Sequence, residues 1–165
     1  MSQVKFTRVR NKISTAIGQG RGITASEATK RASVALETLR IPCIETIENA
    51  LVEIERRFGS GAPGRANEPL LDLYILASRI IDLAGFMPDT GIDQAANALC
   101  ELIDRSMVAK RTPWEAVDVN IRSLQLLRMH GANFSADRRA AIIQGLRDVI
   151  ANRFATAPAP SGPRQ

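Results

Sequence analysis

The chain has few residues of the kinds that most metal and catalytic sites need. Its 165 residues include one histidine, His130, and two cysteines, Cys43 and Cys100. The cysteines are too far apart in the sequence to form a zinc motif, and we expect both to be buried structural thiols. No glycine-rich phosphate loop and no Ser–His pair at motif spacing is present. The sequence therefore predicts no cofactor, no metal site and no catalytic residue, and an enzyme is the least favoured class of protein.

Aromatic residues and long apolar runs are also scarce. Only 4% of the residues are aromatic, whereas Ala, Leu and Ile are abundant, and this mixture favours helices over strands. No window of 18 uninterrupted apolar residues occurs, so we predict no membrane-spanning helix. No apolar segment follows the basic N-terminus, which argues against a secretory signal and predicts a cytoplasmic protein.

Acidic residues are absent from residues 1–23, which carry five of the 22 Lys and Arg side chains. The remaining residues hold 17 basic and 17 acidic side chains, so the net charge of +5 belongs to this segment. One interpretation is a solvated, flexible leader. The alternative is an arm that binds the phosphates of nucleic acid or of a membrane surface.

The rest of the chain shows the apolar spacing of helices, with no alternating strand pattern. Six helices are predicted, in about residues 24–40, 43–58, 68–84, 90–110, 113–130 and 135–154. Pro42 has no amide donor, and we expect it to end or kink the first of them. Short connections between long helices imply antiparallel neighbours. The prediction is an all-α antiparallel helical bundle in residues 24–154, between the basic leader (1–23) and a disordered, proline-rich tail (155–165).

The helix in residues 68–84 has a second apolar feature outside its strong core stripe. The predicted core stripe consists of Leu70, Leu73, Tyr74, Ala77, Ile80, Ile81 and Ala84. On a helical wheel, a strip away from the core stripe contains Leu71, Ile75, Ser78 and Asp82, with Arg79 beside it. Exposed aliphatic side chains with polar neighbours are typical of a contact site. The alternative is that the first helix packs over Leu71 and Ile75 and buries them.

The segment LYILASRIIDLAGFMPDTGIDQAANALCELID resembles the histidine-phosphotransfer (Hpt) domain, in which a helix with the pattern H-T-L-K-G-S-A-G is followed by a glycine-containing turn and a second amphipathic helix. Aligning Gly85 with the last glycine of that pattern places Ser78 at the position of the phosphorylated histidine. The resemblance covers about 60 residues, and it rests on the apolar pattern more than on identities. It implies an Hpt-like four-helix core with one or two extra helices.

This chain departs from the Hpt pattern at the residues that carry the chemistry. Phosphotransfer needs an exposed imidazole as nucleophile and a nearby cation. Ser78 has no neighbouring histidine to activate it, Ile81 stands where a lysine is expected, and Asp82 would repel a phosphoryl group. His130 lies at the end of the fifth predicted helix, where it suits the helix dipole; its alternative role is that of a displaced phosphoacceptor.

The basic leader and the histidine-less helix also resemble the small CheE-type proteins of alphaproteobacterial chemotaxis operons, mainly in LYILASRIIDLAGF and ALCELIDR. Both resemblances imply a non-catalytic adaptor in bacterial two-component signalling. Its expected partner is a response-regulator receiver domain, bound through Leu71, Ile75, Ser78, Arg79 and Asp82. Two alternatives remain open: a homodimer formed through the same residues, and a scaffold or a binder of nucleic acid or membrane surfaces that acts through the leader.

Overall fold

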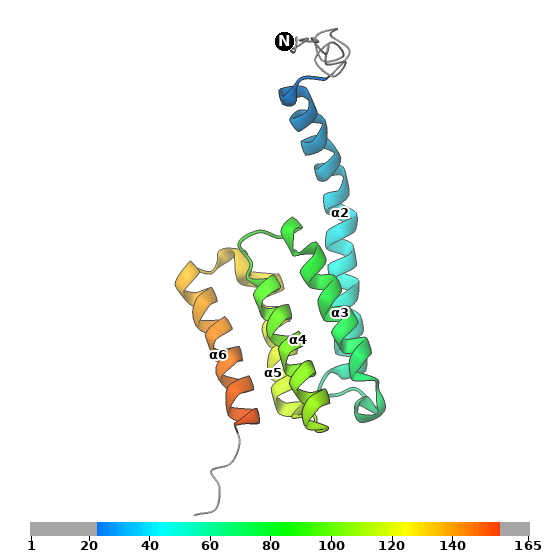
Figure 1. Cartoon of the computed structure of the whole chain (residues 1–165), viewed down its shortest axis with the longest axis vertical. Helices are drawn as coiled ribbons and strands as arrows, with labels where there is room; N and C mark the ends of the chain where they lie inside the picture. The colour runs from blue at the N-terminus through cyan, green and yellow to red at the C-terminus, as the bar shows by residue number, and fades with distance from the viewer. Residues whose placement is uncertain (1–22, 156–165) are drawn as a thin grey trace, which may run out of the picture. The chain divides into compact units, whose positions relative to one another are not determined.

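The computed structural model of the chain describes residues 23–155, which form an all-α structure (Figure 1). Its α-helices are α2 (Ala25–Phe58), α3 (Leu70–Leu83), α4 (Ile92–Ala109), α5 (Trp114–His130) and α6 (Ala136–Phe154), with short 3₁₀ helices at Arg65–Asn67, Ala84–Phe86 and Gly131–Asn133. No residue between 23 and 155 belongs to a strand. The predicted all-α helical bundle is confirmed. Apart from Ile23 and Ala155, the predicted leader and tail lie outside the described residues.

Pro42 does not end a helix, so the expectation of separate helices in residues 24–40 and 43–58 is wrong. One helix, α2, runs from Ala25 through Pro42 to Phe58. Proline removes the bond to the carbonyl of residue 38, but the helix resumes because its later turns bury Ile47, Leu51 and Ile54. The chain nevertheless divides into two compact units, between Leu39 and Arg40. In the first unit, the described residues 29–39 are all exposed.

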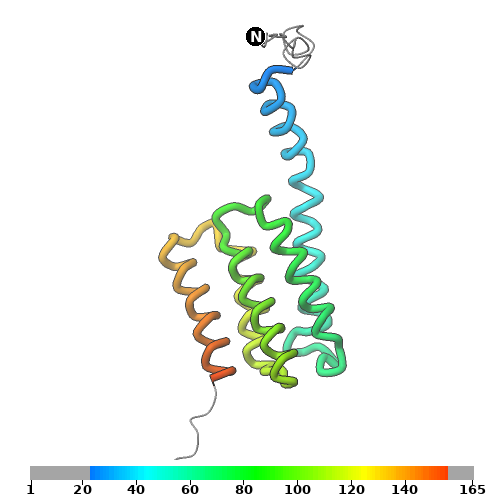
Figure 2. The backbone as a smooth tube through the Cα atoms, viewed as in Figure 1, coloured from blue at the N-terminus to red at the C-terminus, as the bar shows by residue number. Residues whose placement is uncertain are grey.

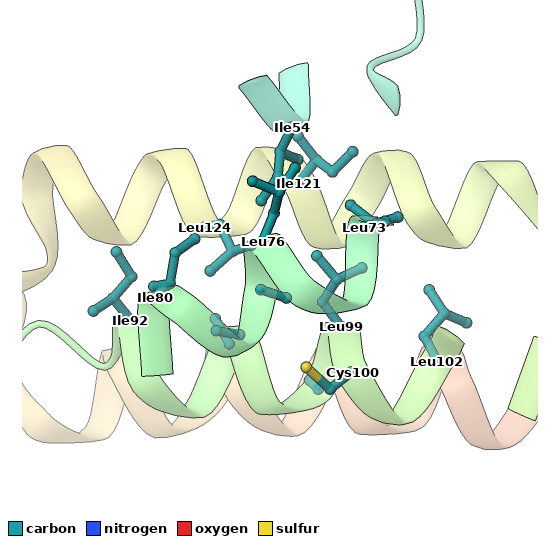
Figure 3. Close-up of a cluster of buried hydrophobic side chains, with 14 of the residues drawn as sticks. Ile54, Leu73, Leu76, Ile80, Ile92, Leu99, Cys100, Leu102, Ile121 and Leu124 are labelled. Carbon is teal, nitrogen blue, oxygen red and sulfur yellow. The ribbon is translucent and has the colours of Figure 1, made fainter. Parts of the chain in front are cut away.

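The second unit is organised around α4, which packs against α3, α5 and α6. The trace in Figure 2 shows these helices side by side. Because α4 has neighbours on several sides, half of its 18 residues are buried. All six of its predicted inward residues are buried: Ile92, Ala95, Ala96, Leu99, Leu102 and Ile103. Figure 3 shows part of this core, with Leu99 of α4 beside the side chains of α3.

The end of α5 contacts the turn between α3 and α4 very closely. Gly131, just after α5, is buried, and a Cβ atom there would lie 2.3 Å from the carbonyl oxygen of Thr90. Thr90 is itself fixed in the turn, because its hydroxyl donates to the carbonyl of Met87 at 2.8 Å. Gly91 follows with a φ of 76°, a left-handed conformation that glycine adopts without strain, and α4 begins at the next residue.

Two arginines fasten the 59–69 loop to the helices. Arg57 of α2 pairs with Glu68 of the loop and, at 2.5 Å, with Asp72 of α3. Hydrogen bonds to Asp72 and Glu68 raise the pKa of Arg57 above its usual value. Arg65 lies 2.5 Å from Asp118 of α5, and its guanidinium stacks 4.8 Å from the centre of the Trp114 ring. These contacts position α3, α2 and α5 relative to one another within the second unit.

Candidate partner-binding surface

The five residues Leu71, Ile75, Ser78, Arg79 and Asp82, here called the α3 strip, follow one face of α3. The helix begins after Pro69, whose extended conformation and missing amide suit the position before the first helical residue. Leu71 is 56% exposed and Ile75 48% exposed. Arg79 and Asp82 are exposed, and Ser78 is half-buried. The predicted exposure of the two aliphatic side chains is therefore confirmed.

The buried face of α3 is shifted around the helix relative to the predicted core stripe, because Leu70, Tyr74 and Ile81 are only half-buried. Leu73, Ala77 and Ile80 are buried, as predicted. Leu76, which lay outside the predicted stripe, is also buried. Figure 3 shows it beside Ile54 of α2 and Ile121 of α5. The buried face of α3, packed against α4, fixes the direction in which the α3 strip points.

Ser78 of the α3 strip has a thiol as its polar neighbour. Its Oγ lies 3.9 Å from the Sγ of Cys100 in α4, a weak hydrogen bond in which either atom can donate. Burial raises the pKa of the Cys100 thiol, and the charge of Asp104 adds to this, against the opposing effect of the bond from Ser78. The thiol is therefore protonated at neutral pH, and it cannot serve as a base for the serine hydroxyl.

His130 does not belong to the α3 strip. It is the last residue of α5, it is exposed, and its ring lies 6.3 Å from that of Phe134. Since this is the chain's one histidine, no imidazole is available on α3. The two cysteines are free thiols, with Cys100 buried, as predicted, and Cys43 only half-buried.

A second surface, which the sequence analysis missed, lies between α2 and α5. It is an open groove of about 690 Å³, here called the α2–α5 groove, lined by Glu48, Leu51, Val52, Glu55, Arg56, Gln125, Arg128 and Met129. Val52 and Met129 are 66% and 64% exposed. The sequence signal was weak, because the charged residues of α2 are typical of a solvated face. Val52, an aliphatic residue among these charged residues, was the one feature of the sequence that could have indicated the groove.

Residues 23–155 contain no group of three His, Cys, Asp or Glu side chains placed to hold a metal ion. Every helix in the same range is too short or too polar to span a lipid bilayer. Two surface features of residues 23–155 are the α3 strip and the α2–α5 groove. Comparisons of the chain with protein-family models, with curated proteins and with solved structures found no significant match.

Proposed function

We propose that the protein is a non-catalytic adaptor of bacterial two-component or chemotaxis signalling, which binds a response-regulator receiver domain in the cytoplasm through the α3 strip. The observation that carries this proposal is the pair Leu71 and Ile75, which project from a rigidly packed helix and remain half exposed. In the Hpt domain, which this helix resembles, the corresponding face receives the receiver domain. Ser78 replaces the histidine there, so docking is retained without phosphotransfer.

The composition of the α3 strip suits binding more than chemistry. Full burial of a leucine or isoleucine side chain contributes about 1.5–3 kcal/mol. Leu71 and Ile75 start half exposed, so each can supply roughly half of that on docking. Arg79 and Asp82 border them and can fix the orientation of a charged partner. Asp82 also disfavours a phosphoryl group on Ser78, one turn away, because like charges repel.

The test is an NMR titration of the labelled full-length protein with receiver domains of its own organism, with and without a phosphoryl mimic. We expect the largest shifts at Leu71, Ile75, Ser78 and Asp82. Leu71→Arg and Ile75→Arg should each weaken binding by about tenfold or more, because a charge replaces a buried aliphatic contact. Val119→Arg, at another exposed aliphatic on α5, is the matched control and should leave the affinity unchanged.

Unchanged affinity in Leu71→Arg and Ile75→Arg would show that the α3 strip is not the docking face. The alternative use of the same surface is a homodimer through the α3 strip. In that case, the NMR shifts of the strip residues would depend on the protein's own concentration. Binding of nucleic acid or a membrane surface would depend on residues 1–22, which lie outside the described residues, and stays a prediction. Its signature is an affinity that falls steeply with salt.

A further inference from the structure

The α2–α5 groove has no role in the function proposed above and shares no residue with the α3 strip. From its shape and charges we infer that it is the interface of a homodimer, in which α2 of a second copy lies antiparallel to α2 in the groove. The twofold axis passes near Val52. Each copy then inserts Val52 between Leu51 and Met129 of the other, so the contact is the same from both sides.

The groove offers apolar side chains that the rest of the described chain does not cover. Val52 and Met129 are the most exposed of its residues with large apolar side chains, and Leu51, which also lines the groove, is buried. Exposed aliphatic groups around a hollow mark an interaction surface more reliably than single exposed residues do. Methionine adapts its shape readily to a partner, so Met129 can close around an inserted valine.

The charges on α2 indicate why the partner is a second copy. Glu48 and Arg56 both line the groove, four residues before and four residues after Val52. Residues at this spacing share one face of a helix. In an antiparallel pair centred on Val52, Glu48 of each copy faces Arg56 of the other. Within its own copy Arg56 donates to Glu53 through Nε and Nη2, at 2.8 and 2.6 Å, and a guanidinium has further N–H donors for Glu48 of the second copy. The arrangement is therefore complementary to itself, with two equivalent ion pairs that flank the apolar centre.

The groove is also held open by contacts within one copy. Arg128 of α5 pairs with Glu48 of α2 at one end. Gln125 donates a hydrogen bond to Glu55 of α2, at 3.0 Å, nearer the other end. Both bridges link α2 to α5 and maintain their spacing, so docking requires little rearrangement of the free protein. A carboxylate has several acceptor sites, and Glu48 can bind Arg128 and Arg56 of the second copy together.

The first experiment measures self-association of the full-length protein by sedimentation equilibrium over a range of concentrations. The wild type should form a dimer, and Val52→Arg should raise the dimer's Kd by about tenfold or more, because it places two like charges on the twofold axis. Leu71→Arg, on the α3 strip, is the matched control and should dimerise like the wild type. This control also separates the two proposals, because a dimer through the strip would respond to Leu71→Arg instead.

The second experiment exchanges the charges. Glu48→Arg and Arg56→Glu should each weaken dimerisation, because every cross-copy pair then joins like charges. An equimolar mixture of the two variants should dimerise again, since in the mixed dimer each cross-copy pair once more joins an arginine to a glutamate. Circular dichroism of each variant confirms that it is folded. A folding defect would not be repaired by mixing, so recovery in the mixture reports the cross-copy contact itself.

Several results would overturn the inference. One is a wild-type protein that stays monomeric up to about 1 mM, whatever else occupies the groove. Another is a dimer that Val52→Arg leaves intact, or a mixture of the charge variants that does not recover. Shifts at Val52 and Met129 on addition of a receiver domain to a monomeric protein would assign the groove to that partner. If only the receiver titration at the α3 strip fails, the dimer inference is unaffected, because it depends on other residues.

Discussion

Replacing Gly131 by alanine is expected to lower the free energy of unfolding, although the backbone conformation there suits any residue. Gly131 has φ and ψ of −56° and −40°, which are helical values. Alanine would therefore cause no backbone strain, and its higher helix propensity alone would stabilise by at most about 1 kcal/mol. The added Cβ atom, however, would lie 2.3 Å from the carbonyl oxygen of Thr90.

The size of the effect follows from this contact. Ordinary contacts of a Cβ atom begin at 3.4 Å, so the two segments must separate by 3.4 − 2.3, or 1.1 Å. The neighbour is backbone in a buried turn, and Thr90 is further held by its bond to Met87. Overpacking of this kind costs about 2–3 kcal/mol. After the gain in propensity, Gly131→Ala should lose about 1–2 kcal/mol, or roughly 2–8 °C in Tm for a chain of this length.

The assay is urea and thermal unfolding followed by far-ultraviolet circular dichroism, with Gly145→Ala as the matched control. Gly145 lies within α6, and a Cβ atom there would have no neighbour within 4 Å. This control should be more stable than the wild type by about 1 kcal/mol, because only helix propensity changes. If Gly131→Ala is as stable as Gly145→Ala, the end of α5 does not contact the Thr90 turn as closely as described, and the expected loss of stability is refuted.

Three further predictions concern the described core and its loop. Iodoacetamide at neutral pH should modify Cys43 well before Cys100, by peptide mass spectrometry, because Cys100 is buried and its pKa is raised above the usual 9.0. Because the pKa of Cys100 is higher in the folded state, the thiol of the unfolded chain ionises at a lower pH than that of the folded protein. The contribution of Cys100 to stability is therefore present below pH 9 and is lost as the pH rises through the folded pKa. Urea titrations at several alkaline pH values, with Cys100→Ser as control, measure this loss. Arg65→Lys should lower stability by about 1 kcal/mol in thermal unfolding, because lysine keeps the charge but loses the planar stacking on Trp114; a Tm equal to that of the wild type would contradict it.

The amphipathic pattern predicted the helices best where one helix has a continuous apolar face. In α4, every residue expected to face inward is buried. The pattern was less accurate in α3, where Leu76 is buried and the expected core residues Tyr74 and Ile81 are only half-buried. Asn120 shows the same limit: it is fully buried in α5, and its amide donates to the carbonyl of Ala116, a local bond that no apolar spacing indicates.

The two candidate surfaces also differ in how far a local sequence pattern can predict them. The exposure of Leu71 and Ile75 followed from the wheel of a single helix, because the core stripe of α3 fixes where its other face points. The α2–α5 groove joins Val52 to Met129, which are 77 residues apart by position (129 − 52), so no local pattern could reveal it. Pro42 does not end the helix, because burial of the later turns of α2 outweighs the loss of one hydrogen bond.

The backbone amides of α2 before and after Pro42 should exchange their protons with the solvent at different rates. Residues 29–42 are all exposed, and the ladder of hydrogen bonds is interrupted where proline has no N–H to donate. The turns before Pro42 can open without disturbing any buried side chain, so their amides should exchange with deuterium in local fraying events. From Ile47 to Phe58 the same helix carries core residues, and its amides should exchange only when the bundle itself unfolds. The two parts of α2 therefore open in different ways: the turns before Pro42 open locally, and the later turns open only with the bundle. Changes in the first turns should leave the melting of the bundle unchanged.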